Sequence, residues 1–167
     1  MKKLLLLVSV LVLSMSLMAC GSEEKGNDEK ANDSAKAITG AVADIAKKLV
    51  DEGKFTDEVV EVENADMINQ KLDIDGEKTE EMVCYYGTGD SSNIVYVAKF
   101  KEAADASAAK SKLETYLSEL KTANESYDPE ELGKIDNAIL EIDGQYAIMV
   151  ISDDNDSAKD IIDGFRK

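Results

Sequence analysis

The chain contains no histidine and no tryptophan, and it has a single proline and two cysteines among its 167 residues. The absence of histidine excludes the Ser-His and Cys-His pairs of nucleophilic catalysis, and it excludes metal sites with imidazole ligands. The absence of tryptophan disfavours a stacking platform for sugars. The stretch Gly87-Thr88-Gly89 lacks the lysine and helix start of a nucleotide-binding loop. Binding proteins and enzymes that use acidic side chains remain, and no catalytic residue stands out.

The start of the chain has the composition of a secretory signal. Met1-Lys2-Lys3 is positively charged, and Leu4 to Leu17 is apolar apart from three serines. A positive start, a short apolar run and a small residue before the cleavage site are typical of a signal peptide. The apolar run is shorter than the ~20 residues that span a bilayer, which disfavours a permanent transmembrane helix. We therefore predict that residues 1–19 are a signal peptide.

A cysteine follows this segment directly. Leu17-Met18-Ala19-Cys20 resembles the bacterial lipobox. The resemblance implies cleavage before Cys20, a thioether-linked diacylglycerol on Cys20, and a further acyl chain such as palmitate on its amino group. One acyl chain binds a membrane only marginally, at ~0.8 kcal/mol per buried methylene, whereas two or three hold a protein there. We predict localisation at the cell membrane, lipid-anchored on the extracytoplasmic face; the alternative is an ordinary signal with an accidental cysteine.

The next residues predict a spacer and then a folded domain. Gly21 to Lys36 has no large apolar residue, which is typical of a disordered tether. We assign residues 20–36 to the lipidated cysteine and this tether, and residues 37–167 to a single globular domain. Because Cys20 carries lipid, Cys84 stands alone and no intramolecular disulfide is expected. Its setting among Met82, Val83, Tyr85 and Tyr86 is typical of a buried thiol in a strand.

The charge of the chain is strongly negative. It has 35 acidic and 19 basic residues, a formal net charge of −16. Such a charge disfavours nucleic acid and anionic lipid headgroups as partners, and it attracts cations or a basic protein; a basic or an envelope protein is therefore the possible partner. The alternative is that the acidity serves only solubility and repulsion from an anionic envelope.

The apolar periodicity predicts alternating helices and hairpins. Helices are expected over residues 37–52, 65–72 and 103–123, with a short one from 128 to 133 and another through 158–165. Two β-hairpins are expected at about 79–100 and 137–152, the second around Asp143-Gly144. This order predicts an α+β fold, in which helices pack mainly on one face of an antiparallel sheet.

Two helix starts carry capping signals. Asn64 precedes the helix that begins at residue 65. In Asp128-Pro129-Glu130-Glu131, we expect Asp128 as the cap, Pro129 at the first helical position, and Glu131 as the partner in a capping box.

Two acidic clusters are candidate sites for a hard cation such as calcium. The first contains Asp153, Asp154 and Asp156, and the second contains Asp73, Asp75 and Glu77. Calcium takes six to eight oxygen ligands, but neither cluster has the spacing of an EF-hand loop. Capping of the last helix is the favoured explanation of the first cluster, and a solvated turn is the favoured explanation of the second. We expect no cofactor, with calcium as the alternative.

Several stretches together are similar to one known family. The relevant residues are Ile94–Phe100, the long helix after them, Tyr127-Asp128-Pro129, Asn137-Ala138 and Gly144–Ser152. They resemble the DUF4358 domain proteins, a family of uncharacterised lipoproteins of Gram-positive bacteria. Leu72-Asp73-Ile74-Asp75 is similar to an earlier family segment, with Leu72 where an aromatic residue is usual. The resemblance covers about Ile38 to Phe165 and implies a fold, but it brings no catalytic residues.

These observations predict a membrane-anchored, non-catalytic binding or interaction module. The first alternative is an accessory protein that binds a divalent cation through one of the acidic clusters. The second is a hydrolase with paired carboxylates, a weak hypothesis because 35 acidic residues always place some pair close together. The six tyrosines, as a ligand-binding surface, form a further possibility; the simpler interpretation assigns them to the core and its rim.

Overall fold

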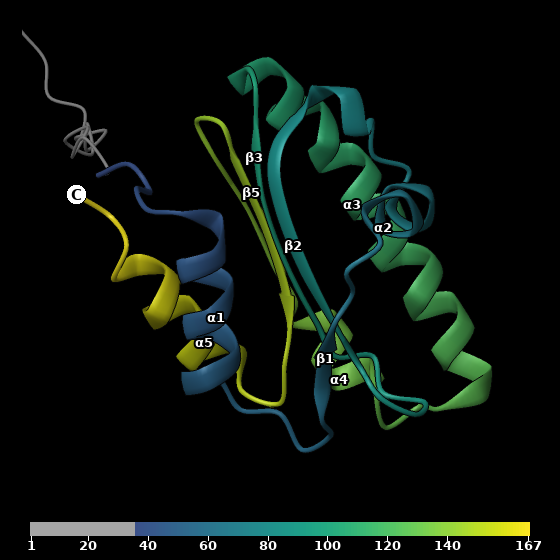
Figure 1. Cartoon of the computed structure of the whole chain (residues 1–167). Helices are drawn as coiled ribbons and strands as arrows, with labels where there is room; N and C mark the ends of the chain where they lie inside the picture. The colour runs from purple at the N-terminus through teal and green to yellow at the C-terminus, as the bar shows by residue number, and fades with distance from the viewer. Residues whose placement is uncertain (1–35) are drawn as a thin grey trace, which may run out of the picture. The chain divides into compact units, whose positions relative to one another are not determined.

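Branched and aromatic residues form five strands in one antiparallel sheet. A computed structural model describes residues 36–167, so the predicted signal peptide, Cys20 and most of the tether lie outside the described residues. The sheet has the order β1-β2-β3-β5-β4 (Figure 1). Its strands are β1 (Val59–Glu61), β2 (Thr79–Gly87), β3 (Ile94–Phe100), β4 (Ile139–Asp143) and β5 (Tyr146–Ile151).

The sheet consists of the two predicted hairpins joined side by side. The pairs β2–β3 and β4–β5 are the hairpins, and β3 pairs with β5 from Ile94↔Ile151 to Lys99↔Tyr146. Gly144 makes the second turn at φ 56°, a conformation that glycine adopts without a steric penalty. This pairing makes β3 and β5 the central strands of the sheet, and nearly all of their residues are buried, on both faces.

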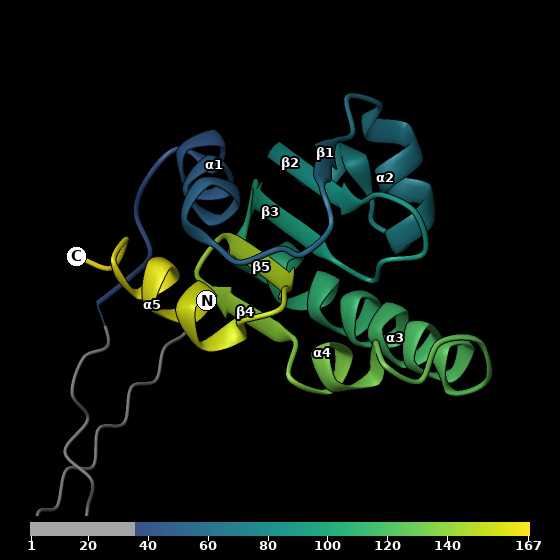
Figure 2. The same ribbon diagram turned by 90° about the horizontal axis from the view of Figure 1, so that it is seen from below.

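Helices cover both faces of the sheet (Figure 2). One face packs on α1 (Val42–Glu52) and α5 (Asn155–Asp163). The other packs on α2 (Ala65–Leu72), α3 (Ala103–Tyr127) and α4 (Leu132–Asp136). The α+β class and the antiparallel sheet are confirmed, but the prediction of helices mainly on one face is wrong. Because successive residues of β3 and β5 are apolar, neither face can remain exposed to water.

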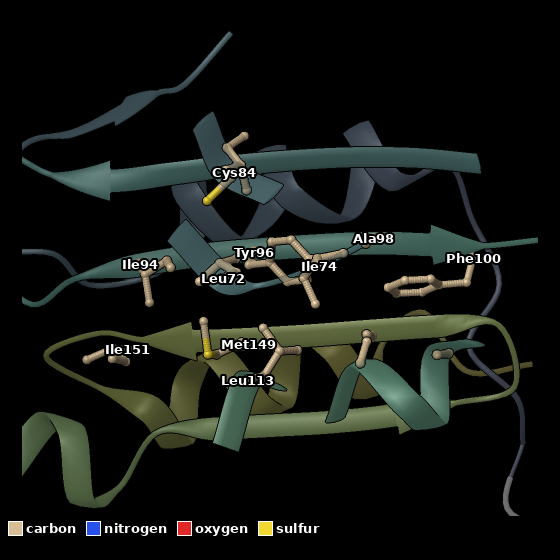
Figure 3. Packing of buried hydrophobic residues seen from close by; sticks show 14 of the residues in the cluster. Leu72, Ile74, Cys84, Ile94, Tyr96, Ala98, Phe100, Leu113, Met149 and Ile151 are labelled. Atoms are coloured by element: carbon tan, nitrogen blue, oxygen red, sulfur yellow. The ribbon is translucent and has the colours of Figure 1, made fainter. Parts of the chain in front are cut away.

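The core on the α3 side is the larger of the two. Tyr96 of β3 and Met149 of β5 lie between the sheet and Leu113 of α3 (Figure 3). Two small residues of α3, Ala106 and Ala109, are also buried there, so the helix axis approaches the sheet closely. The small side chains at these two positions leave room for this approach.

The two ends of the described chain lie together. Ile38 forms a β-bridge with Arg166, and Thr39 N donates to Phe165 O at 2.9 Å. Arg166 also pairs with Glu141 and Asp143 of the edge strand β4. Residues 37–40 all use backbone groups in long-range contacts, so α1 begins at Val42 and not at Ala37 as predicted.

None of the helices in residues 36–167 combines the length and the apolar composition needed to cross a membrane.

Candidate functional site

The buried polar side chains of residues 36–167 gather at one end of the sheet. They are Ser92 and Asn93 before β3, Asn124 near the end of α3, and Ser152 after β5, each at most 7% exposed. Buried polar groups need hydrogen-bond partners. Asn124 Nδ2 donates to Ser92 Oγ at 3.4 Å and to Leu120 O at 2.9 Å. This end of the sheet is therefore held by polar contacts, whereas the centre is apolar.

Glu131 and Lys134 extend this network. Glu131 Oε2 accepts the backbone N–H of Ser92 at 2.8 Å, and Glu131 Oε1 pairs with Lys134 Nζ at 2.7 Å. Lys134 Nζ also lies 3.3 Å from Asp153 Oδ1. The side chains of Glu131 and Lys134 are only 13% and 15% exposed. A half-buried ion pair of this kind depends on the hydrogen bonds that satisfy its remaining atoms.

The capping box predicted at Asp128-Pro129-Glu130-Glu131 does not form. Asp128 Oδ1 accepts the N–H of Glu130 at 3.2 Å, which makes a turn, and α4 runs from Leu132 to Asp136 instead of ending near residue 133. Glu131 is unavailable to the helix start because Ser92 and Lys134 occupy its carboxylate.

A surface hollow of about 500 Å³ lies beside this network. It is lined by α4 and the residues after it, by the end of β5, and by the first turns of α5. The predicted acidic residues Asp153, Asp154 and Asp156 all line it, together with Lys134 and Lys159. The structure therefore brings the first acidic cluster together in one place, next to basic side chains.

Asp154 is the N-cap of α5. Its carboxylate accepts the N–H of Ser157 at 3.0 Å and the Ser157 hydroxyl at 2.9 Å, and it pairs with Lys54 Nζ at 2.6 Å. The hydrogen bond from Lys54, followed by those from Ser157, lowers the pKa of Asp154 to about 2. The capping interpretation of this cluster is confirmed at Asp154.

Asp153 connects the same end of the sheet to the segment after α1. Its Oδ2 accepts the N–H of Thr56 at 2.7 Å and Nδ2 of Asn93 at 3.5 Å. Partial burial acts to raise the pKa of Asp153, but the Thr56 N–H and Lys134 outweigh this and hold the pKa below its usual range. Asp156, in the first turn of α5, is exposed.

Structural contacts account for Asp153 and Asp154 of the first acidic cluster and for Asp73 and Asp75 of the second. Asp73 is the C-cap of α2 at φ 53° and pairs with Lys112, and Asp75 accepts the N–H of Glu77 at 3.0 Å. These residues border the short 3-10 helix η1 (Gly76–Lys78). Over residues 36–167, no group of three or more Cys, Asp or Glu side chains is placed to hold a metal ion.

Comparison with known families gives one match. The family described as "Domain of unknown function (DUF4358)" matches residues 51–152, which is more than half of the chain. The chain belongs to the DUF4358 family. No curated protein and no solved structure matches it.

The DUF4358 match covers the sheet and the helices on one of its faces, but not the two helices on the other face. Residues 51–152 contain all five strands and α2, α3 and α4, but they exclude α5 and nearly all of α1. The match thus includes Glu131, Lys134 and the four buried polar residues, and it ends before Asp153. The resemblance expected over residues 38–165 is confirmed over this shorter range.

Cys84 lies in the core of the DUF4358 domain, as predicted. It is a free thiol on β2 with no exposed surface, and burial raises the pKa of the Cys84 thiol to about 12. The neighbouring hydroxyls of Tyr86 and Tyr96 are buried without a hydrogen-bond partner among the described residues. A thiol held in its neutral form is a poor nucleophile.

The tyrosines do not share one surface. Tyr96 is buried in the core and Tyr127 is 73% exposed, while Tyr85 donates to Glu61 at 3.0 Å and Tyr146 donates to Gly40 O at 2.7 Å. The simpler interpretation, that the tyrosines belong to the core and its rim, is confirmed for five of them but is wrong for Tyr127. Sequence reasoning missed Ser92, Asn93, Asn124 and Lys134, because no local pattern distinguishes a buried polar side chain from a loop residue.

Proposed function

We propose that this protein is a membrane-anchored extracytoplasmic lipoprotein whose DUF4358 domain acts as a non-catalytic binding or interaction module. The lipobox at residues 17–20 supports the anchor. The domain supports the non-catalytic part of the proposal, because the carboxylates at its polar end are occupied by structural contacts: Asp153, Asp154 and Glu131 each accept a backbone N–H and pair with a lysine. The pairing of these carboxylates is the observation that carries the proposal.

The anchor is tested by fractionation of cells that express the full chain. We expect the wild-type protein in the membrane fraction and a Cys20→Ser variant in the soluble extracytoplasmic fraction, since a serine side chain cannot receive the thioether-linked lipid. Cys84→Ala is the matched control and should remain in the membrane, because Cys84 is buried in the fold. Equal membrane retention of wild type and of Cys20→Ser that has lost residues 1–19, as mass spectrometry of its N-terminus would show, would contradict the proposal.

The binding of a divalent cation is the second candidate function, because three carboxylates line one hollow. Calorimetry of the full chain with calcium tests it, with the Asp153→Asn variant as the control. Heat that is lost in the variant would support a cation site. The absence of both heat and any change in melting temperature at millimolar calcium would dismiss it.

A further inference from the structure

The outer edge of β1 carries unpaired backbone groups. Thr88 N donates to Glu58 O at 2.8 Å, and Val62 N donates to Cys84 O at 2.9 Å, with Val60 opposite Tyr86. In an antiparallel ladder, residues that bond to the neighbouring strand alternate with residues that point away from it. The N–H and C=O groups of Val59 and Glu61 therefore point away from the sheet, at its open edge (Figure 1).

Beyond the end of β1, the open edge of the sheet is formed by the part of β2 that β1 does not cover. β1 covers only Tyr85 to Gly87 of the nine-residue β2, because the chain leaves the sheet at Asn64 to begin α2. Met82 has the same orientation as Cys84, two residues away, so its N–H and C=O also point to this side. Among residues 36–167, no hydrogen bond to these two groups of Met82 from outside the sheet is found.

The edge is acidic, and its acids are not neutralised within the described domain. Five acidic residues lie between Lys54 and Lys71, and no basic residue does; they are Asp57, Glu58, Glu61, Glu63 and Asp66. The salt bridges of residues 36–167 include none of them. An open strand of this kind attracts a positively charged chain and repels a second copy of itself.

Exposed apolar side chains lie in the same segment. The domain has three exposed large hydrophobic residues, and two of them, Val60 on β1 and Met67 at the start of α2, belong to it. Val60 is 43% exposed and Met67 is 51% exposed. A strand that docks on β1 gains apolar contact from Val60 in addition to backbone hydrogen bonds.

We propose that the β1 edge docks an extended, lysine- or arginine-rich segment of a partner protein as an additional strand. The backbone groups of Val59 and Glu61 supply the ladder, the acids beside them select a basic segment, and Val60 contacts its apolar side chains. This inference rests on the proposed binding function and names the site and the partner chemistry for it.

The test uses the full chain in detergent and a synthetic peptide of alternating lysine and valine, about ten residues long. We expect binding that weakens as salt is added, because charge attraction contributes to it. A peptide of the same sequence with N-methyl groups along both edges keeps its charge but cannot join a ladder. We expect it to bind at least about fivefold more weakly, as the loss of backbone hydrogen bonds predicts.

Substitutions on and beside β1 test whether the peptide binds at this edge. Val59→Pro removes an N–H that points to solvent, a position where an edge strand tolerates proline, and it should weaken binding at least about fivefold. Glu58→Gln/Glu63→Gln should weaken binding more than Glu125→Gln/Asp160→Asn, which removes the same charge from exposed positions in α3 and α5. Failure of the lysine-valine peptide to bind would overturn the proposal. Equal binding of the methylated peptide would also overturn it, because attraction by charge alone would then be the explanation.

Failure of the docking site and failure of the proposed function are distinguishable. Crosslinkers placed in cells at Val60 and at Asp156 report on the edge and on the hollow separately. A partner captured from Asp156 but not from Val60 would overturn strand docking and leave a binding module standing. Membrane retention of Cys20→Ser after removal of residues 1–19 would overturn the anchor, whatever the result with the peptide.

Discussion

Glu131 accepts a hydrogen bond from the backbone N–H of Ser92, 39 positions earlier in the chain, at 2.8 Å. The contact connects the turn before α4 to the loop that enters β3, the strand at the centre of the sheet. Since Glu131 also pairs with Lys134, one carboxylate satisfies a backbone donor and a half-buried ammonium group.

Glu131→Ala should lower the free energy of unfolding by about 2 kcal/mol, because a charge-assisted hydrogen bond is lost and Lys134 loses one of its two carboxylate partners. Urea denaturation followed by circular dichroism measures the change. Glu130→Ala is the matched control: its side chain is exposed, and we expect a change within about 0.5 kcal/mol. Equal effects of the two variants would contradict a special role for Glu131.

Acid should destabilise the domain through Asp154. Its pKa in the folded chain is about 2, lowered by Lys54 and then Ser157, whereas an unfolded aspartate titrates near ~3.9. The folded state therefore gains stability from Asp154 above about pH 4, and it loses this contribution as the pH falls towards 2. Carbon NMR of the Asp154 carboxyl group during an acid titration measures this pKa.

Lys54→Met should raise the pKa of Asp154, because the first of its causes is removed while the bonds from Ser157 remain. Lys47→Met is the control, since Lys47 pairs with Asp51 and not with Asp154. An unchanged pKa of Asp154 in Lys54→Met would show that the ion pair seen here does not control the titration.

Cys84 should resist thiol reagents in the native protein. Burial raises its pKa to about 12, so very little thiolate is present at neutral pH, and the sulfur has no exposed surface. Alkylation with iodoacetamide, followed by mass spectrometry of the Cys84 peptide, should give little product in buffer and full labelling in urea. Rapid labelling of the folded chain would contradict the buried position.

Glycine at position 144 should matter for stability more than glycine at position 133. A Cβ at either position meets no atom within 4 Å, but only Gly144 has a positive φ, of 56°. Gly144→Ala should therefore cost about 1 kcal/mol from backbone strain alone. Gly133→Ala lies in α4 and should be neutral or stabilising by up to about 1 kcal/mol. Urea denaturation of the pair measures both, and equal destabilisation would contradict this explanation.

Local signals in the sequence were sufficient for elements that depend on near neighbours. Asn64 caps α2 through the N–H of Met67, and Asp154 caps α5 through the N–H of Ser157, each only three residues away. The Asp128-Pro129 signal failed for the opposite reason. Its partner Glu131 contacts Ser92 instead, and a local pattern cannot include a donor that folding brings from a distant loop.

The candidate site could be predicted only in part. Asp153, Asp154 and Asp156 are recognisable as a cluster, but the lysines that pair with them, Lys54 and Lys134, lie far away in sequence. No short stretch of sequence contains these pairs, and proximity along the chain is misleading: Lys159 is the nearest lysine to the cluster, but it pairs with Asp163.

The amino-acid sequence alone determined the two hairpins with their four strands, most of the helices and the burial of Cys84, since periodicity and turn chemistry act over a few residues. The tertiary structure alone decided that helices cover both faces of the sheet. It alone decided which carboxylates are paired with lysines and which edge strand keeps its backbone groups open. Those outcomes depend on which distant segments come together when β3 pairs with β5. The burial of a side chain and its ion-pair partners are set by neighbours that are distant in the sequence.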